Sequence, residues 1–129
     1  MKQRSLLVIA SLLECPAGLA LIAMPAYAIS FLLGVTPHED GIVIGRVAGV
    51  ALFALGVVCW RARSDAGGPA LVGTLSAITL YNAGAGLILA GLVATGKTGG
   101  LVLLLAAVVH LGVALAFAYS MLRSSSSKA

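Results

Sequence analysis

The chain of 129 residues is 60% hydrophobic and only 9% charged, with a formal net charge of +4 at neutral pH. Because so few polar residues cannot cover a soluble core, this composition excludes an ordinary soluble domain and favours a membrane protein. Most of the basic residues stand at the ends of apolar runs, and no basic patch is interleaved with aromatic residues. The positive charge therefore does not predict nucleic-acid binding.

The apolar residues fall into four runs separated by short polar or glycine-rich segments. An apolar run of about 20 residues is long enough to cross a hydrocarbon layer of about 30 Å as a helix. The predicted spans cover residues 5–24, 42–60, 69–94 and 101–122. We therefore predict an all-α fold, a polytopic membrane protein with a four-transmembrane-helix bundle. Residues 1–123 form its single domain, and residues 124–129 form a polar tail.

The first run also has features of a secretion signal. Lys2 and Arg4 precede the apolar stretch, and residues 26–28 (AYA) resemble a cleavage site. However, the stretch is longer than the roughly 7–15 apolar residues of such signals, and Glu14 interrupts it. We therefore expect this segment to be retained as the first span.

Two prolines divide the first span and the segment that follows it. Pro16 lies inside the span and removes one helical hydrogen bond, which favours a kink. Pro25 marks either a second kink or the true end of the span. In the second case residues 26–33 form a short interfacial helix, with Tyr27 near the lipid headgroups.

The basic residues divide unequally between the two ends of the predicted spans. One side carries Lys2, Arg4, Arg61, Arg63, Arg123 and Lys128, and the other carries Lys97. Because cytoplasmic loops are enriched in Lys and Arg, this bias predicts that both termini are cytoplasmic. Trp60, Arg61 and Arg63 are expected to anchor the second span at the cytoplasmic interface.

Small residues recur at helical spacing on the second and third spans. They are Gly41, Gly45, Ala48 and Gly56 on the second span, and Gly73, Ala77, Gly84 and Gly91 on the third. Residues three or four apart share one face of a helix, and small side chains let two backbones approach closely in lipid. We therefore expect these two faces to meet, so that the second and third spans pack as a hairpin.

Residues 91–98, GLVATGKT, fit the phosphate-loop pattern GxxxxGK(S/T), in which Lys97 and Thr98 would face phosphates and a magnesium ion. The pattern has this meaning only between a strand and a helix, with an acidic partner for the metal. Here a predicted membrane helix precedes it, so we expect a turn between two spans. No nucleotide and no nucleic acid is predicted as a partner.

Each span contributes one polar residue at a similar predicted depth. Measured at about 1.5 Å per residue from the cytoplasmic ends, Glu14, Arg46, Asn82 and His110 lie roughly 15–21 Å along their helices. Tyr81 is next to Asn82. Because an unpaired charge at such depth costs roughly 2.5–3.5 kcal/mol on insertion scales, we expect Glu14 and Arg46 to face inward and to pair.

Two interpretations of this polar layer remain open. A carboxylate, an imidazole and an amide in a water-poor interior are suited to proton coupling or to binding a quinone headgroup. The same groups can also form a satisfied structural network that fixes the rotation of the helices. The guanidinium of Arg46 can instead snorkel outward, since its Cβ leans toward the outer end of the span.

The sequence offers no other constellation of reactive residues. His, Cys, Asp and Glu do not cluster at the spacing of metal ligands, and no serine stands in a nucleophile elbow. We therefore predict no catalytic residue, no metal site and no cofactor.

The segments GRVAGVAL, ALG and CWRAR, all within residues 45–63, resemble a group of small bacterial inner-membrane proteins with four predicted spans. Glu14, the neighbours Tyr81 and Asn82, and His110 are also similar to residues of that group. The resemblance covers nearly the whole chain. It implies the four-span architecture and the inner-membrane location, but no activity.

A second resemblance is useful as a contrast. Small multidrug-resistance transporters are similar in length and carry a glutamate in the first span, where Glu14 stands. This sequence departs from them because it lacks an aromatic-rich cavity. Its strong charge bias also indicates a single orientation, whereas those transporters pair in opposite orientations.

These observations lead to an expected function and an alternative. Because packing faces are present and catalytic residues are not, we expect a non-enzymatic accessory or scaffold subunit that acts through helix packing. Its partners would be the lipid bilayer and either other membrane subunits or a second copy of the chain. The alternative is a small proton-coupled transporter, or a binding protein for a hydrophobic ligand such as a quinone or a lipid, that uses the polar layer.

Overall fold

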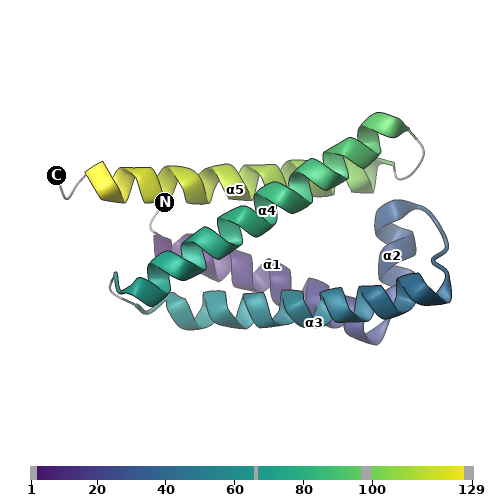
Figure 1. Ribbon diagram of the computed structural model, residues 1–129, viewed down its shortest axis with the longest axis horizontal. Coiled ribbons are helices and arrows are strands. Elements are labelled where there is room, and N and C mark those ends of the chain that lie inside the picture. The colour runs from purple at the N-terminus through teal and green to yellow at the C-terminus, as the bar shows by residue number, and fades with distance from the viewer. Residues whose placement is uncertain (1–2, 66, 97–99, 127–129) are drawn as a thin grey trace.

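The computed structural model of the protein describes residues 3–65, 67–96 and 100–126. These residues form α1 (Gln3–Ala23), α2 (Pro25–Leu33), α3 (Glu39–Ala62), α4 (Pro69–Thr95) and α5 (Leu101–Ser126), with no strand among them (Figure 1). Of these helices, α1, α3, α4 and α5 are long and apolar enough to cross a membrane. The prediction of an all-helical chain with four such helices is therefore confirmed.

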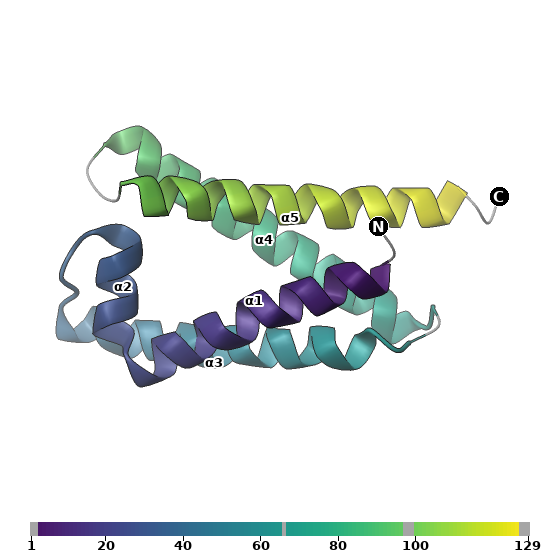
Figure 2. The same ribbon diagram turned by 180° about the vertical axis from the view of Figure 1, so that it is seen from behind.

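The first long helix ends before Pro25. α1 stops at Ala23, and α2 starts at Pro25, which has no N–H to donate and fits the first turn of a helix. α2 ends at Gly34, whose φ of 71° is left-handed and whose N–H donates to the carbonyl of Ser30. α1 itself continues through Pro16. Of the two alternatives for Pro25, the structure thus has the end of the helix, and α2 folds back toward α5 (Figures 1 and 2).

Side-chain hydrogen bonds shape the turn before α4 and the end of α5. The carboxylate of Asp65 accepts from the backbone N–H groups of Gly68 and Leu71, in the first turn of α4. At the end of α5, Ser124 Oγ accepts from Gln3 Nε2 at 3.2 Å, so α1 begins where α5 ends. α5 includes residues 124–126, which the sequence placed in a polar tail, and the rest of that tail lies outside the described residues.

The four long helices pack as two pairs, α1 with α3 and α4 with α5 (Figures 1 and 2). In the first pair the backbones nearly touch, because a Cβ atom added to Gly49 would lie 2.8 Å from the carbonyl oxygen of Gly18. In the second pair, a Cβ atom added to Gly86 would lie 2.8 Å from the side chain of Leu111. Glycines therefore set the distance of closest approach within each pair.

The glycine faces of the second and third predicted spans do not meet. Gly45 lies against α2, and Gly56 lies against α1. Of the other small residues, Gly41 is half-buried, Ala48 and Ala77 are exposed, and Gly73, Gly84 and Gly91 have no atom within 4 Å of an added Cβ. The predicted hairpin of α3 on α4 is therefore wrong. The reason is Gly18, which leaves room opposite Gly49 and lets α1 cover the face of α3 that α4 was expected to cover.

The hydrophobic core fills one end of the bundle. Buried side chains from all four long helices cluster where α1 begins and α5 ends, including Leu7, Cys59, Ile78 and Phe117. Toward the other end the two pairs diverge, and α2 lies in the space between them (Figure 2). The tight end holds the pairs together, and the divergence opens the interior at mid-bundle.

Candidate functional site

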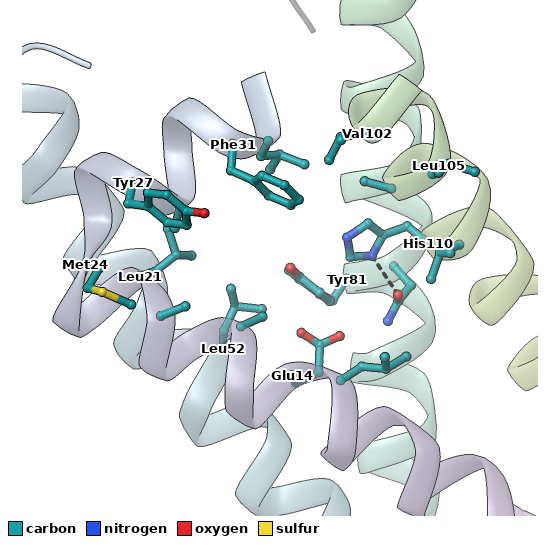
Figure 3. Close-up of a pocket in the computed structure, with 18 residues that line it drawn as sticks. Glu14, Leu21, Met24, Tyr27, Phe31, Leu52, Tyr81, Val102, Leu105 and His110 are labelled. Atoms are coloured by element: carbon teal, nitrogen blue, oxygen red, sulfur yellow. Dashed lines mark hydrogen bonds between the residues drawn. The ribbon is translucent and has the colours of Figure 1, made fainter. Parts of the chain in front are cut away.

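A cavity of about 620 Å³ lies between the two helix pairs, next to α2 (Figure 3). Its lining comes from all five helices, and α4 contributes only polar residues. The apolar lining residues are Leu13, Ala17, Ala20, Leu21, Met24, Ala28, Phe31, Leu32, Leu52, Val102, Leu105, Ala106 and Val109. Five lining residues carry polar side-chain groups: Glu14, Tyr27, Tyr81, Asn82 and His110. The cavity therefore combines a large apolar wall with a small polar region.

Asn82 is the centre of the polar region. Its side chain is 2% exposed, and its Nδ2 donates to the carbonyl oxygen of Ile78, one turn earlier in α4, at 2.9 Å. Its Oδ1 is 2.8 Å from Nδ1 of His110. This contact joins α4 to α5 at the level of the cavity, and it satisfies both ends of an amide that would be costly to bury unpaired.

Glu14 brings the carboxyl group of α1 to the same place. It is 5% exposed, and it interacts with the side chain of Asn82. Figure 3 shows its two oxygens directed from α1 toward Tyr81 and His110. Among the described residues no cation is paired with it, so the polar region contains an acid without a counter-charge.

Tyr81 and His110 complete the polar region from α4 and α5. Their rings meet edge to face, with centroids 5.8 Å apart and planes at 81°. This arrangement is favourable for aromatic rings, and it gives the imidazole a second contact in addition to Asn82. In Figure 3 the hydroxyl group of Tyr81 extends into the cavity.

The structure thus brings together four of the five residues of the predicted polar layer, namely Glu14, Tyr81, Asn82 and His110. The fifth, Arg46, is exposed on α3, so the expected ion pair with Glu14 is not formed. The reason is the rotation of α3. Gly45 and Gly49 turn toward α1 and α2, and the next residue after Gly45 is about 100° further around the helix. Arg46 therefore lies on the exposed side of α3.

Sequence reasoning missed the contribution of α2 to the site. Tyr27 and Phe31 line the cavity from one face of α2, with ring centroids 6.4 Å apart and planes at 9° (Figure 3). Tyr27 and Phe31 are four residues apart in the segment that follows Pro25, which indicates that they share one face of a helix. This spacing does not reveal in which direction a short helix folds back. The direction is set by the turn at Met24, the residue between α1 and α2.

The remaining predicted residues lie away from the cavity. At the end of α3 the guanidinium of Arg63 stacks 3.6 Å from the ring centre of Trp60 and donates to the carbonyl of Trp60, and Arg61 is exposed nearby. The first residues of the phosphate-loop pattern continue α4 as far as Thr95, whereas Lys97 and Thr98 lie outside the described residues. Within the described part of the chain, no three His, Cys, Asp or Glu residues group closely enough to hold a metal ion.

No protein-family model, no curated protein and no solved structure matches the chain. The chemistry of the site must therefore be argued from its own residues.

Proposed function

We propose that this chain is an integral membrane protein that binds a lipophilic molecule between its two helix pairs. The observation that carries the proposal is the cavity of about 620 Å³, whose apolar walls end at Glu14, Tyr81 and His110. Pockets for small molecules have this size and composition, with a few polar groups that orient the ligand. The apolar part of the molecule would lie along α2 and α5, and its polar group would face these three side chains.

The outer surface supports a membrane location. Large apolar side chains are exposed on the long helices, such as Leu80 at 75%, Leu115 at 71% and Ile88 at 68%. Exposed apolar surface on this scale marks contact with lipid or another protein. The proposed orientation, with both termini in the cytoplasm, rests on the distribution of basic residues. The proposed location in the inner membrane rests on the resemblance to small bacterial inner-membrane proteins.

A purely structural role for the polar residues leaves the cavity unexplained. The bond between Asn82 and His110 accounts for helix association on its own. It does not require Ala17, Ala20 and Ala106 to be small where they line an open space. An occupant with an apolar body explains both the volume and the walls.

Photolabelling of the full chain in lipid nanodiscs tests this proposal. The probe is an aryl diazirine with an alkyl chain, and labelled sites are read by mass spectrometry. We expect labelling on the cavity face of α2 and α5. Ala106→Trp places a large ring in the cavity next to α2 and should lose most of the labelling. Ala51→Trp on the exposed face of α3 should keep it. Equal labelling of the two variants would contradict the proposal.

The role as an accessory or scaffold subunit is a second proposal, favoured by one observation. Gly73, Ala77, Gly84 and Gly91 form a stripe on α4 that no other helix covers. Such a stripe lets another helix approach closely in lipid. Gly84→Leu should therefore weaken assembly with a partner or a second copy, as measured by energy transfer between labelled chains in membranes, without changing the fold of the single chain. Unchanged energy transfer would contradict this second role.

A further inference from the structure

The proposed binding site contains one hydrogen-bonding atom whose character can be derived from its surroundings, Nε2 of His110. We infer that the cavity recognises a lipophilic molecule through a hydroxyl group, which donates a hydrogen bond to Nε2 of His110. The inference rests on the proposed function and specifies the class of its ligand. It follows from two hydrogen bonds of Asn82 and from the direction in which the imidazole ring of His110 faces.

The first contact fixes the orientation of the Asn82 amide. Its nitrogen lies 2.9 Å from the backbone carbonyl oxygen of Ile78. A carbonyl oxygen only accepts hydrogen bonds, so the group facing it must be the NH₂ of the amide and not its oxygen. The amide oxygen therefore points the other way, toward α5.

The second contact fixes the proton of the imidazole. Oδ1 of Asn82 only accepts, and it lies 2.8 Å from Nδ1 of His110. Nδ1 must then carry the hydrogen and donate it. A neutral imidazole has one ring proton, so Nε2 presents a lone pair.

The third observation is where that lone pair points. In Figure 3 the ring nitrogen of His110 that does not bond Asn82 faces the cavity, on the side of Tyr27 and Phe31. Within the described part of the chain no group hydrogen-bonds this nitrogen, although the ring is half-buried. Nε2 of His110 is therefore a hydrogen-bond acceptor that faces the cavity. A ligand with a hydroxyl group can donate a hydrogen bond to it.

The other polar groups agree with a hydroxyl ligand. The Tyr81 hydroxyl both donates and accepts, so it can donate to the oxygen of a ligand whose hydrogen is given to His110. The carboxyl group of Glu14 approaches from α1 and adds further acceptor capacity. A ketone or an ether offers no hydrogen to Nε2, and its binding would cover that acceptor without pairing it.

Two sources share this chemistry, a phenol or quinol ring with an alkyl chain and an aliphatic lipid alcohol. The rings of Tyr27, Phe31 and Tyr81 line the cavity, which suits a flat aromatic ring, and its many aliphatic lining residues suit an alkyl chain. The shared feature is the hydroxyl group, and the experiment separates the two sources.

The experiment measures binding to the full chain in nanodiscs, corrected with empty nanodiscs. The probes are 4-nonylphenol, its methyl ether, 4-nonylacetophenone and a straight-chain alcohol of similar length. We expect the phenol to bind at least about tenfold more tightly than the ether and the ketone, the cost of one unpaired buried acceptor. Tight binding of the alcohol as well would indicate a lipid source, and binding of the phenol without the alcohol would indicate an aromatic one.

A matched variant ties the preference to His110. His110→Phe keeps a ring and removes both nitrogens, so the preference for phenol over ether should fall to nearly none, while binding of the ether persists. Because this variant also removes the partner of Asn82, ¹⁵N NMR of the native protein provides a second readout. It should show a protonated Nδ1 and an unprotonated Nε2 in His110, the histidine that lines the cavity.

Different outcomes would contradict hydroxyl recognition by His110 and ligand binding in the cavity. If the ether or the ketone binds as tightly as the phenol, or if Nε2 carries the proton, hydroxyl recognition is wrong and the cavity remains a binding site. If none of the four probes binds and Ala106→Trp has no effect on labelling, the proposed function fails as well.

Discussion

Asn82 shows how one side chain can organise three helices at the residue scale. Its nitrogen bonds its own helix, its oxygen bonds His110 on α5, and Glu14 of α1 interacts with it. In a water-poor interior an amide with both ends satisfied specifies a single arrangement of its neighbours, because each alternative leaves a polar group unpaired. The amide therefore positions the imidazole rather than merely filling space.

Replacement of Asn82 should reveal this positioning role. Asn82→Leu leaves Nδ1 of His110 without its acceptor, and we expect a loss of about 1–2 kcal/mol in the free energy of unfolding in detergent. The double variant Asn82→Leu with His110→Leu removes both partners. Its loss should be smaller than the sum of the two single losses. Additive losses would show that the two side chains act independently.

At the scale of single elements, the packing of α1 on α3 depends on the absence of side chains. The backbone of Gly18 faces the backbone of Gly49, and Gly56 faces Cys15. In lipid, such close approach replaces the hydrophobic driving force that helices have in water. By contrast, Gly73, Gly84 and Gly91 of α4 do not bring two helices of the described chain into close contact.

A pair of equal substitutions separates the two kinds of glycine. Gly49→Ala puts a methyl group 2.8 Å from a backbone oxygen, so the helices must separate, and we expect a loss of about 1–3 kcal/mol in the free energy of unfolding. Gly84→Ala meets no atom and should be neutral or stabilise the chain by about 0.4–1 kcal/mol. Reversible unfolding in mixed detergent micelles measures both, and similar losses would contradict this packing.

The turn that follows α2 is built on Gly34, so the position of α2 is sensitive to this residue. The φ of 71° there is accessible to glycine, whereas a β-branched residue is strained by roughly 1–2 kcal/mol in this conformation. Gly34→Val should therefore loosen α2. We expect faster hydrogen exchange of the amides in residues 25–33, with Gly91→Val on α4 as a control that changes nothing near the cavity. Unaltered exchange in α2 would show that Gly34 does not fix it.

In the whole molecule, the two helix pairs pack closely at one end of the bundle and diverge at the other. The sequence predicted the four long helices because hydropathy alone determines them, and Pro25 indicated where the first could end. It also placed Glu14, Asn82 and His110 at matching heights, since height depends only on the rise per residue. These three residues were therefore candidates for one site before any packing was known.

The rotation of α3 could not be derived in the same way. A helix that is apolar on every side carries no hydrophobic phase, so its orientation depends on which neighbour fits its glycines. The close fit of Gly18 to Gly49 decides it, and that fit turns Arg46 outward. The cavity escaped prediction for a related reason, because it arises from the divergence of two pairs and from the fold-back of α2.

The pairing has a consequence for how the chain can be divided. Each pair is complete within one half of the sequence, α1 and α3 before the turn at Asp65, and α4 and α5 after it. A gene severed at that turn should yield two fragments that insert separately and reassociate in the bilayer. Glu14 would arrive on one fragment, and Asn82 and His110 on the other. Neither fragment alone would retain a ligand, and co-expression should restore retention by complementation.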